Sequence, residues 1–416
     1  MANKIRKPLI RFKGFTDDWE QRKLGEIAQR VIVGLATSVT PYYREEGIPI
    51  LRNLNIKENY LDDNDVLYLD SDYANKQVSK QIHTGDVLTV HTGYIGTSCV
   101  VPSKYDKCLT FTTLVTTTNN DKLIGSFLSQ YLNSDSGMIS TQMVTTQGGR
   151  QNLNTNDFEK VEIPFPSVDE QNKIYNILEL FDQTITLHQR KLDKLLNIKK
   201  SMLDKMFPKN GSDKPEIRFK GFTDAWEQRK LGEITGKIID KNSDMAITET
   251  LTNSAEFGII SQTDFFDHAI SKLNKLSGYT VVRKDYFVYN PRISVTAPVG
   301  PINRNKLDRD GVMSPLYTVF STHDIDNSFL EWFFKNNSWH KFMRFNGDSG
   351  ARSDRFSIKD EVFFRMPVLA PNDKEHIEQK HIGKFFEQLE HVITLHQRKL
   401  EKLKNLKKAC LERMFV

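Results

Sequence analysis

The sequence predicts an α+β protein made of two related halves, each of which ends in a long helix. Three features support this prediction. Near-identical segments open and close each half, a four-and-three spacing of apolar residues marks the helices, and runs rich in Val, Ile, Thr and aromatic residues lie between them. A chain of 416 residues is long enough for two or three domains, and the duplication favours two.

Each half opens on the same stretch of sequence. IRFKGFTDDWEQRKLGEI occupies residues 10–27 and returns at 217–234 with one difference, Asp18 against Ala225. The regions that follow have diverged beyond simple recognition. Near-identical segments at the ends of each half, with different sequences between them, indicate one scaffold that presents two different surfaces. A recent duplication whose loops have drifted is the simpler alternative.

The variable regions, about 28–150 and 235–352, follow the same order of elements. Short strands come first, then a helix and a polar loop, and a proline-containing strand leads into the long helix. In the first half short strands are expected within 47–56, 85–102 and 109–118, a mostly helical segment at 121–143, the loop at 147–154 and the last strand at 161–166. In the second half the strands are expected at 257–266, 280–295 and 314–322, the helix at 328–345, the loop at 347–356 and the last strand at 365–371.

The long helices carry the pattern of a coiled coil. ITLHQRKL occurs at 185–192 and again at 393–400, and alternate steps of four and three residues give an apolar seam in each copy. The simplest partner for each helix is the other. The predicted seam residues are Ile174, Leu178, Phe181, Ile185, His188, Leu192, Leu195, Met202, Ile382, Phe386, Leu389, Ile393, His396, Leu400 and Leu403. The two histidines are interpreted as a polar pair that sets the register, in preference to a metal or acid–base site.

The short linker after the first helix determines how the helices can pair. About ten residues, PKNGSDKPEI, span at most about 35 Å, whereas a helix from Glu170 to Met206 is about 55 Å long. The second helix must therefore run back antiparallel to the first, which places Phe415 beside the N-terminal IRFKGF segment. We expect two pseudo-two-fold-related globular domains separated by an intramolecular antiparallel coiled coil. The expected divisions are 1–18 (frame segment), 19–166 (first globular domain), 167–207 (first long helix), 208–225 (linker and repeated frame segment), 226–371 (second globular domain) and 372–416 (second long helix).

Composition excludes several classes of protein. Hydrophobic residues at 38% and aromatics at 10% are enough for real cores, which argues against wholesale disorder. Cys99, Cys108 and Cys410 show neither metal-ligand spacing nor a disulfide framework. No apolar stretch fits a signal peptide or a membrane span, so we expect a cytoplasmic, soluble protein. The net charge of +5 is compatible with nucleic acid but does not indicate it.

Catalytic motifs are nearly absent from the sequence. GEITGKI at 232–238 has three residues between its glycines and lacks the Ser or Thr of a phosphate-binding loop. HExxH, CxxC, GxSxG and the Pro-Pro-aromatic loop of amino-methyltransferases do not occur. We therefore expect a chain that is not an enzyme by itself and binds no metal or cofactor.

Binding is the better supported role. Two unlike heads at a fixed separation suit a ligand with two unlike sites, and duplex DNA is such a ligand. Polar loop residues of the types that contact base edges and phosphates form the candidate DNA-binding set. The candidates are Arg52, Asn53, Thr92, Tyr94, Lys104, Arg150, Gln151, Asn290, Arg292, Arg344, Arg352 and Arg355. For any single one of them, a solvated surface side chain is the alternative. Arg150 and Arg352 stand out because each follows a small-residue turn at the same place in its half.

At this point the chain resembles a known family. The motif W-x4-LGEI opens each half, and TGDVLTVHTGYIG follows in the first. GGRQNL at 148–153 and GARSDRF at 350–356 precede the proline-containing strand, and a Glu-Gln pair begins each long helix at 170 and 378. In this duplicated order, over essentially the whole chain, these motifs resemble the specificity subunit of type I restriction-modification systems.

The resemblance implies two target-recognition domains, each of which reads one half of a bipartite, asymmetric DNA site, with the helices as a ruler. It also implies two methyltransferase subunits that carry S-adenosylmethionine, and restriction subunits that use ATP and Mg. Arg190, Lys191, Lys194 and Lys200 on the outer helix face are candidates for partner or phosphate contacts, or are simply solvated. Two other hypotheses stay open: a bivalent protein-binding scaffold, and a self-sufficient restriction or modification enzyme.

Overall fold

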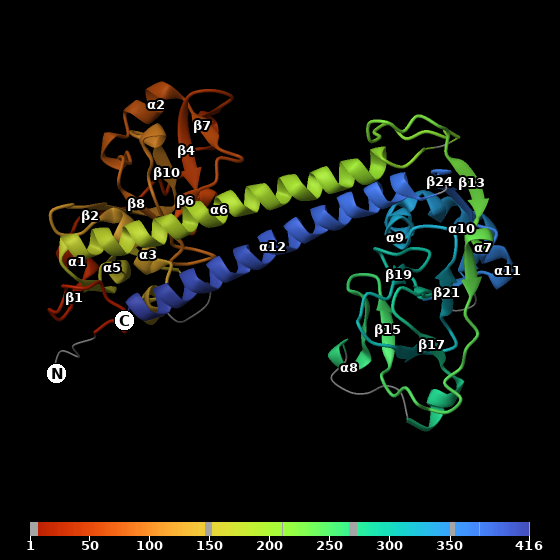
Figure 1. Cartoon of the computed structure of the whole chain (residues 1–416). Coiled ribbons are helices and arrows are strands. Elements are labelled where there is room, and N and C mark those ends of the chain that lie inside the picture. The colour runs from red at the N-terminus through yellow and green to blue at the C-terminus, as the bar shows by residue number, and fades with distance from the viewer. Residues whose placement is uncertain are drawn as a thin grey trace. The chain divides into compact units, whose positions relative to one another are not determined.

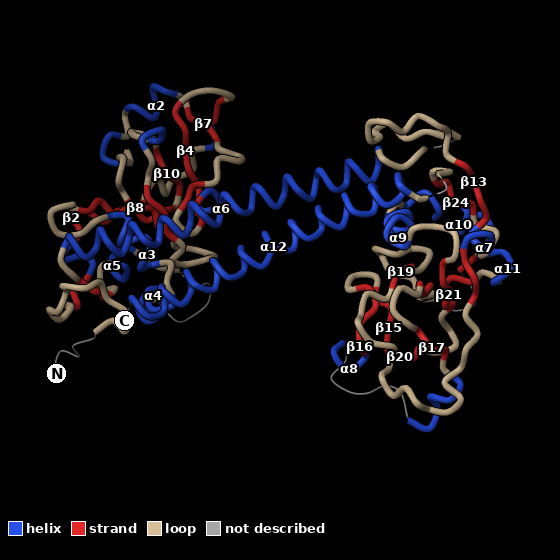
Figure 2. The backbone as a smooth tube through the Cα atoms, in the orientation of Figure 1, coloured by secondary structure: helices blue, strands red, loops and turns tan. Residues whose placement is uncertain are grey.

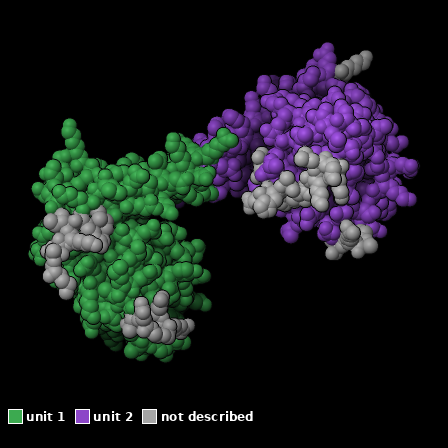
Figure 3. Space-filling view, turned by 90° about the horizontal axis from the view of Figure 1, so that it is seen from below, with its two compact units in different colours: residues 1–189, 398–416 green, residues 190–397 purple. Residues whose placement is uncertain are grey.

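The chain divides into two compact units, which are coloured separately in Figure 3. Unit 1 comprises residues 1–189 and 398–416, and unit 2 comprises residues 190–397. Both long helices, α6 (Val168–Lys205) and α12 (Ile377–Met414), contribute to both units (Figure 1). The structure is a computed structural model that describes residues 7–145, 152–209, 211–265, 273–349, 354–373 and 375–415.

Two four-stranded sheets form the body of unit 1. One has the strand order β2-β11-β8-β9, with every neighbouring pair antiparallel. The other has the order β10-β4-β7-β3, in which only β10 and β4 run parallel. The strands are β2 (Ala28–Val33), β3 (Tyr43–Arg44), β4 (Ile48–Arg52), β7 (Leu67–Leu69), β8 (Val87–Val90), β9 (Ser98–Val100), β10 (Leu109–Phe111) and β11 (Thr113–Thr118). A short hairpin, β5 (Ile56–Lys57) with β6 (Tyr60–Leu61), adjoins them.

Both faces of the first sheet of unit 1 are buried. Successive residues of a strand point to opposite faces, so neighbouring residues show what covers each face. Leu114 of β11 belongs to the cluster that contains helix α3, whereas its neighbour Val115 belongs to the cluster that contains Leu51 of β4. The described residues of the unit also form the short helices α1 (Leu24–Ile27), α2 (Ser71–Asn75), α3 (Gly125–Leu132), α4 (Asp135–Val144) and α5 (Thr155–Phe158). Strand β1 (Glu20–Lys23) pairs antiparallel with β12 (Glu162–Phe165) immediately before α6.

Unit 2 has a corresponding four-stranded antiparallel sheet with the order β14-β21-β18-β19. Its strands are β14 (Thr235–Lys237), β18 (Phe287–Tyr289), β19 (Ile302–Arg304) and β21 (Thr318–Thr322). The other strands form two-stranded pairs: β13 (Glu227–Lys230) with β24 (Pro367–Ala370), β15 (Leu251–Ser254) with β16 (Gly258–Ser261), β17 (Thr280–Val282) with β20 (Gly311–Met313), and β22 (Asp348–Ser349) with β23 (Phe356–Ser357). Figure 2 shows the resulting mixture of helix and strand.

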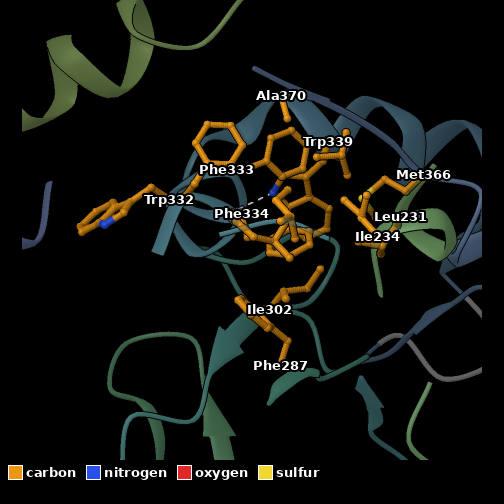
Figure 4. Close-up of a cluster of buried hydrophobic side chains, with 14 of the residues drawn as sticks. Leu231, Ile234, Phe287, Ile302, Trp332, Phe333, Phe334, Trp339, Met366 and Ala370 are labelled. Atoms are coloured by element: carbon orange, nitrogen blue, oxygen red, sulfur yellow. Dashed lines mark hydrogen bonds between the residues drawn. The ribbon is translucent and has the colours of Figure 1, made fainter. Parts of the chain in front are cut away.

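The core of unit 2 is dominated by aromatic rings from one helix. Trp332, Phe333 and Phe334 of α9 (Asn327–Lys335) all belong to this core. In Figure 4 the Trp332 ring points away from the other rings drawn, and it stacks on Phe386 of α12 at 5.0 Å. The indole of Trp339 donates a hydrogen bond of 3.0 Å to the Phe334 carbonyl, so its polar atom is satisfied in the apolar surroundings. The remaining helices are α7 (Leu231–Ile234), α8 (Gln262–Phe265), α10 (His340–Asn346) and α11 (Asp360–Phe363).

Two of the sequence predictions for unit 2 are wrong in part. The single helix expected at 328–345 is two helices, α9 and α10, because the backbone turns extended at Asn336. There the Asn336 side chain accepts from Ser338 N at 2.8 Å and donates to the carbonyl of Leu203 at 2.8 Å. The segment 257–266, expected as one strand, is strand only in β16 and continues into α8. The break between α9 and α10 is explained by the side chain of Asn336, because an asparagine that bonds nearby backbone groups competes with helix propagation.

The same pairing of α6 with α12 occurs inside each unit. In unit 1, Lys407 of α12 bonds Asp182 of α6 at 2.5 Å. In unit 2 the corresponding pair is Lys199 of α6 with Glu390 of α12. Residues that lie later in α12 than Lys407 pack against residues that lie earlier in α6 than Asp182. Cys410 and Leu411 belong to the same cluster as Ile174 and Leu178. Each helix pair is therefore antiparallel within its unit. Among the described residues, no helix is long and apolar enough to cross a membrane.

Candidate nucleic-acid interface

An ion pair closes the frame of unit 1. Arg11 donates two hydrogen bonds, of 2.7 and 2.9 Å, to the buried carboxylate of Glu170 in the first turn of α6, and the indole of Trp19 adds a third at 3.0 Å. These contacts with Glu170 raise the pKa of the Arg11 guanidinium. The next residue, Gln171, accepts from the backbone N–H of Ile124 at 2.9 Å. The repeated sequences at the two ends of this half thus hold each other.

Unit 2 repeats the arrangement with its own copies of these residues. Arg218 donates bonds of 2.6 and 2.7 Å to Glu378, and Gln379 accepts from the backbone N–H of Asp326 at 2.9 Å. One bond is missing, because the Trp226 indole N–H is buried and has no hydrogen-bond partner among the described residues. Its ring packs instead against Phe207 and Phe329. The duplicated frame is therefore a structural clamp, which explains its near-identity in sequence.

The frame segment of each unit also bonds the end of a long helix. In unit 1 the backbone N–H of Ile10 donates to the carbonyl of Arg413 at 3.1 Å, and in unit 2 that of Ile217 donates to Lys205 at 3.0 Å. Phe415 is buried in the core of unit 1, as Phe207 is in the core of unit 2. The predicted placement of Phe415 beside the N-terminal frame is thus confirmed within unit 1.

A hairpin and a neighbouring polar loop meet in unit 1. The hairpin joins β8 to β9, and its residue Thr92 forms an antiparallel bridge with Asn152. The carbonyl of His91 accepts from Leu153 N at 3.0 Å, and the His91 ring bonds the Asn152 side chain at 2.9 Å. Two segments that are some 60 residues apart in sequence therefore form one continuous surface. Arg150 and Gln151, both predicted site residues, lie outside the described residues.

The same construction appears in unit 2 with a different sequence. The hairpin from β18 to β19 bridges to the following polar loop through Arg292 and Arg355. Backbone bonds from Phe356 N to the carbonyl of Pro291 at 2.8 Å and from Ile293 N to Asp354 at 3.0 Å fix the two segments together. Arg292 is exposed and Arg355 is half-buried, which brings two predicted cations together. Arg352 lies outside the described residues.

An asparagine side chain fixes each hairpin. In unit 1, Asn53 donates to the Thr92 hydroxyl at 3.1 Å and accepts from the Thr113 hydroxyl at 3.1 Å. In unit 2 the buried Asn253 donates to the carbonyl of Val288 on β18 at 2.7 Å and accepts from the Asn303 side chain on β19 at 2.6 Å. Asn53, which the sequence suggested as a base reader, is thus occupied with positioning a loop, and Asn253 has the same role in unit 2.

A cavity of about 620 Å³ lies beside the hairpin of unit 1. Its lining combines the exposed rings of Tyr60 and Tyr94 with the polar side chains of Asn53 and Thr92 and with Lys57. Apolar surface with a few convergent polar groups is typical of ligand sites. Three of the predicted site residues therefore share one site.

The other predicted DNA-binding residues that the structure describes either bond to other groups of the protein or lie elsewhere on its surface. Arg52 donates to the carbonyl of Asp65 at 2.5 Å, and Lys104 pairs with Asp63, whose pKa is lowered by bonds from Lys104 and Tyr105. Asn290 donates to the carbonyl of Asn253 at 2.8 Å, and its side-chain oxygen accepts from Arg292 N. Arg344 is exposed on α10, which leads into the polar loop of unit 2.

The predicted seam residues on the long helices are all buried or half-buried. In the part of the chain that the structure describes, no group of three His, Cys, Asp or Glu side chains could hold a metal ion. Sequence reasoning missed Asn253 and the exposed Val295 at the tip of the unit 2 hairpin. It searched for polar and basic loop residues, so a buried asparagine and an exposed valine gave no signal.

Comparisons with known proteins agree with this arrangement. Residues 16–197 match the family model described as the type I restriction modification DNA specificity domain. A putative type I restriction enzyme specificity subunit of Methanocaldococcus jannaschii is 24% identical over 410 residues, which is 94% of this chain and 91% of that protein. The chain is thus similar to type I restriction-modification specificity subunits over nearly its whole length.

Solved structures of specificity subunits share the fold. The S subunit of a type I restriction-modification system from M. genitalium superposes with a TM-score of 0.57 at 12% identity, over 99% of both chains. A chain from a structure titled for complex assembly and conformational transition of the type I R-M system gives a TM-score of 0.50 at 17% identity, over 95% of this chain and 97% of that one. At these identities the likeness concerns the fold.

Proposed function

We propose that the chain is the specificity subunit of a type I restriction-modification system and that each of its units reads one half of a bipartite, asymmetric DNA site. The observation that carries the proposal is the hairpin-and-loop surface of each unit, built in the same way from unlike residues. In unit 1 it presents Tyr94 beside Thr92, and in unit 2 it presents Arg292 beside Arg355. Unlike loops on equivalent supports select unlike half-sites, because hydrogen bonds and apolar contacts to base edges carry sequence information.

Exposed cations supply the sequence-independent part of binding. Arg292 and Arg344 are exposed in unit 2. Arg150, Gln151 and Arg352, which lie outside the described residues, are proposed as further contacts. A guanidinium is suited to bidentate contact with phosphate, which carries no sequence information. Arg52 and Lys104, which already have partners in the fold, contribute to the shape of unit 1 more than to DNA contact.

The paired helices are proposed as the ruler and the docking platform. Both units contain the same antiparallel pairing and the same lysine–acid bond, which supports a continuous intramolecular coiled coil between the two recognition domains, 19–166 and 226–371. Leu187 and Leu395, at matching positions of the repeated ITLHQRKL, are both exposed. Two equivalent apolar positions suit two copies of one partner, the methyltransferase subunit.

The exposed Arg190, Lys191, Lys194 and Lys200 extend the same platform. The chemistry then belongs to the partners: S-adenosylmethionine on the modification subunits, and ATP with Mg on restriction subunits. This chain supplies recognition and spacing, and it is not a catalyst by itself.

Mapping methylated adenines tests the proposal. A host that carries this chain with its modification subunits is expected to methylate one bipartite sequence with two unlike halves. Exchanging the hairpin residues 290–300 for an unrelated sequence should change one half of the site and leave the other unchanged. Methylation of a single contiguous sequence, or change in both halves, would contradict the assignment. The purified chain alone should neither methylate nor cleave DNA.

Insertion into the helices tests the ruler separately. Four residues added to both α6 and α12, about one turn, should lengthen the spacer of the methylated site while both half-sites stay the same. An unchanged spacer would show that the helices do not set the distance.

A further inference from the structure

The two hairpins have one further property in common. Each presents an apolar side chain to solvent at its tip: Val295 is 101% exposed in unit 2, and Tyr94 is 88% exposed in unit 1. Single exposed apolar residues are ordinary on protein surfaces. Here they recur at the tips of corresponding hairpins whose sequences are unrelated, beside the surfaces that we assign to DNA.

The tip of the unit 2 hairpin is a closed turn. Ser294 N donates to the carbonyl of Ala297 at 3.0 Å, and Ala297 N donates back to Ser294 at 3.2 Å. The Ser294 hydroxyl also accepts from Ala297 N at 3.1 Å. Val295 is therefore held outward by three bonds that do not involve its side chain, which itself stabilises nothing in the fold.

Two glycines shape the tip of the unit 1 hairpin. Gly93 and Gly96 flank Tyr94 with positive φ angles of 86° and 92°, a conformation that favours glycine. Gly96 N donates to the carbonyl of Val90 at 3.0 Å, and Thr97 N donates to that of Tyr94 at 3.3 Å. The aromatic ring is thus presented by a backbone that is fixed on both sides.

The nature of the ligand follows from the chemistry at the tips. In the major groove the C5-methyl of thymine is the apolar group that a base pair presents, and apolar side chains, aromatic rings among them, contact it. We propose that Val295 and Tyr94 are specificity-determining residues that each pack against a thymine methyl in the half-site of their own unit. This inference rests on the proposed function, because it needs two half-sites.

Removal of single methyl groups from the DNA tests the proposal. Once the half-sites are mapped, each thymine is replaced in turn by deoxyuridine, and binding of the complex with its modification subunits is measured by competition at fixed salt. One replacement in the half-site of unit 2 should weaken binding by about threefold to fivefold, the effect of one methyl-sized group. Val295→Ala should weaken binding of the thymine duplex similarly and should lose sensitivity to that replacement. Tyr94→Ala should behave likewise in the other half-site.

Matched substitutions control for general surface effects. Ile239→Ala in unit 2 and Val78→Ala in unit 1 remove side chains that are 72% and 66% exposed, and they should leave both binding and the uracil effect unchanged. Equal loss by Val295→Ala on thymine and uracil duplexes would overturn the methyl contact, as would half-sites in which no thymine is sensitive. In either case a retained preference for the mapped site over a scrambled duplex leaves the proposed function standing. Absence of that preference is instead the failure of the proposed function.

Discussion

Substitution of Phe415 by alanine is expected to destabilise unit 1, although most of that unit lies at the other end of the chain. The Phe415 side chain is 2% exposed and its ring lies 5.6 Å from those of Phe127 and Tyr131. Truncation of a buried phenylalanine costs about 3 to 5 kcal/mol. For a unit of this size the corresponding fall in melting temperature is about 6 to 20 °C.

Hydrogen exchange resolved by peptide, together with calorimetry, measures this effect unit by unit. In the Phe415→Ala variant, amides of β8 and β11 should exchange faster while those of β18 and β21 stay protected. Phe207→Ala is the matched variant, because Phe207 fills the corresponding place in unit 2 and should produce the opposite pattern. Phe345→Ala removes an exposed ring and should shift neither unit. Equal loss of protection in both units after Phe415→Ala would refute the reasoning.

Three further outcomes are expected. Glu170→Gln should lower the free energy of unfolding of unit 1 by about 3 to 5 kcal/mol, because Arg11 keeps a charge without its counterion; a change below 1 kcal/mol in chemical denaturation would contradict this. Asn253→Ala should weaken specific DNA binding while the melting temperature changes little, since the side-chain bonds that hold the two strands of the hairpin are lost. Unaltered affinity in a competition assay would argue against the positioning role. The pKa of Asp63 is lowered in the folded state by Lys104, so its contribution to stability is present above the ordinary carboxyl pKa and is lost as pH falls through the lowered value. Acid unfolding followed between pH 5 and 2 should show this loss, and Asp63→Asn should remove it; an identical pH profile in the variant would exclude the linkage.

The repeats allowed much of the frame to be predicted. The repeat predicted helix starts at Glu170 and Glu378, within two residues of the observed starts at Val168 and Ile377, because heptad periodicity is a local property of sequence. The expected division at 372 lies five residues before the start of α12. The antiparallel direction followed from the length of one linker. What escaped prediction depends on contacts between distant residues: the helix break at Asn336 is held by a carbonyl of α6, and the clamp of Asn253 needs both legs of a hairpin.

The candidate site was predicted less completely than the frame. Residue type singled out Asn53 and Asn290 as base readers, whereas their side chains are engaged with neighbouring loops. Tyr94 and Arg292 were identified because they combine a contact-forming side chain with a loop position, and both are exposed. Composition describes what a side chain can bond, but only the fold shows which bonds are already made.

The participation of residues 398–416 in unit 1 has a consequence for synthesis of the protein on the ribosome. All of unit 2 is drawn from one uninterrupted stretch, residues 190–397, and can close as soon as that stretch has emerged. Unit 1, although its first part is translated earlier, lacks Phe415 and its helix segment until residues 398–415 have been translated. The usual order, in which the N-terminal domain folds first, is therefore reversed. Unit 1 completes its core only after unit 2 has been translated.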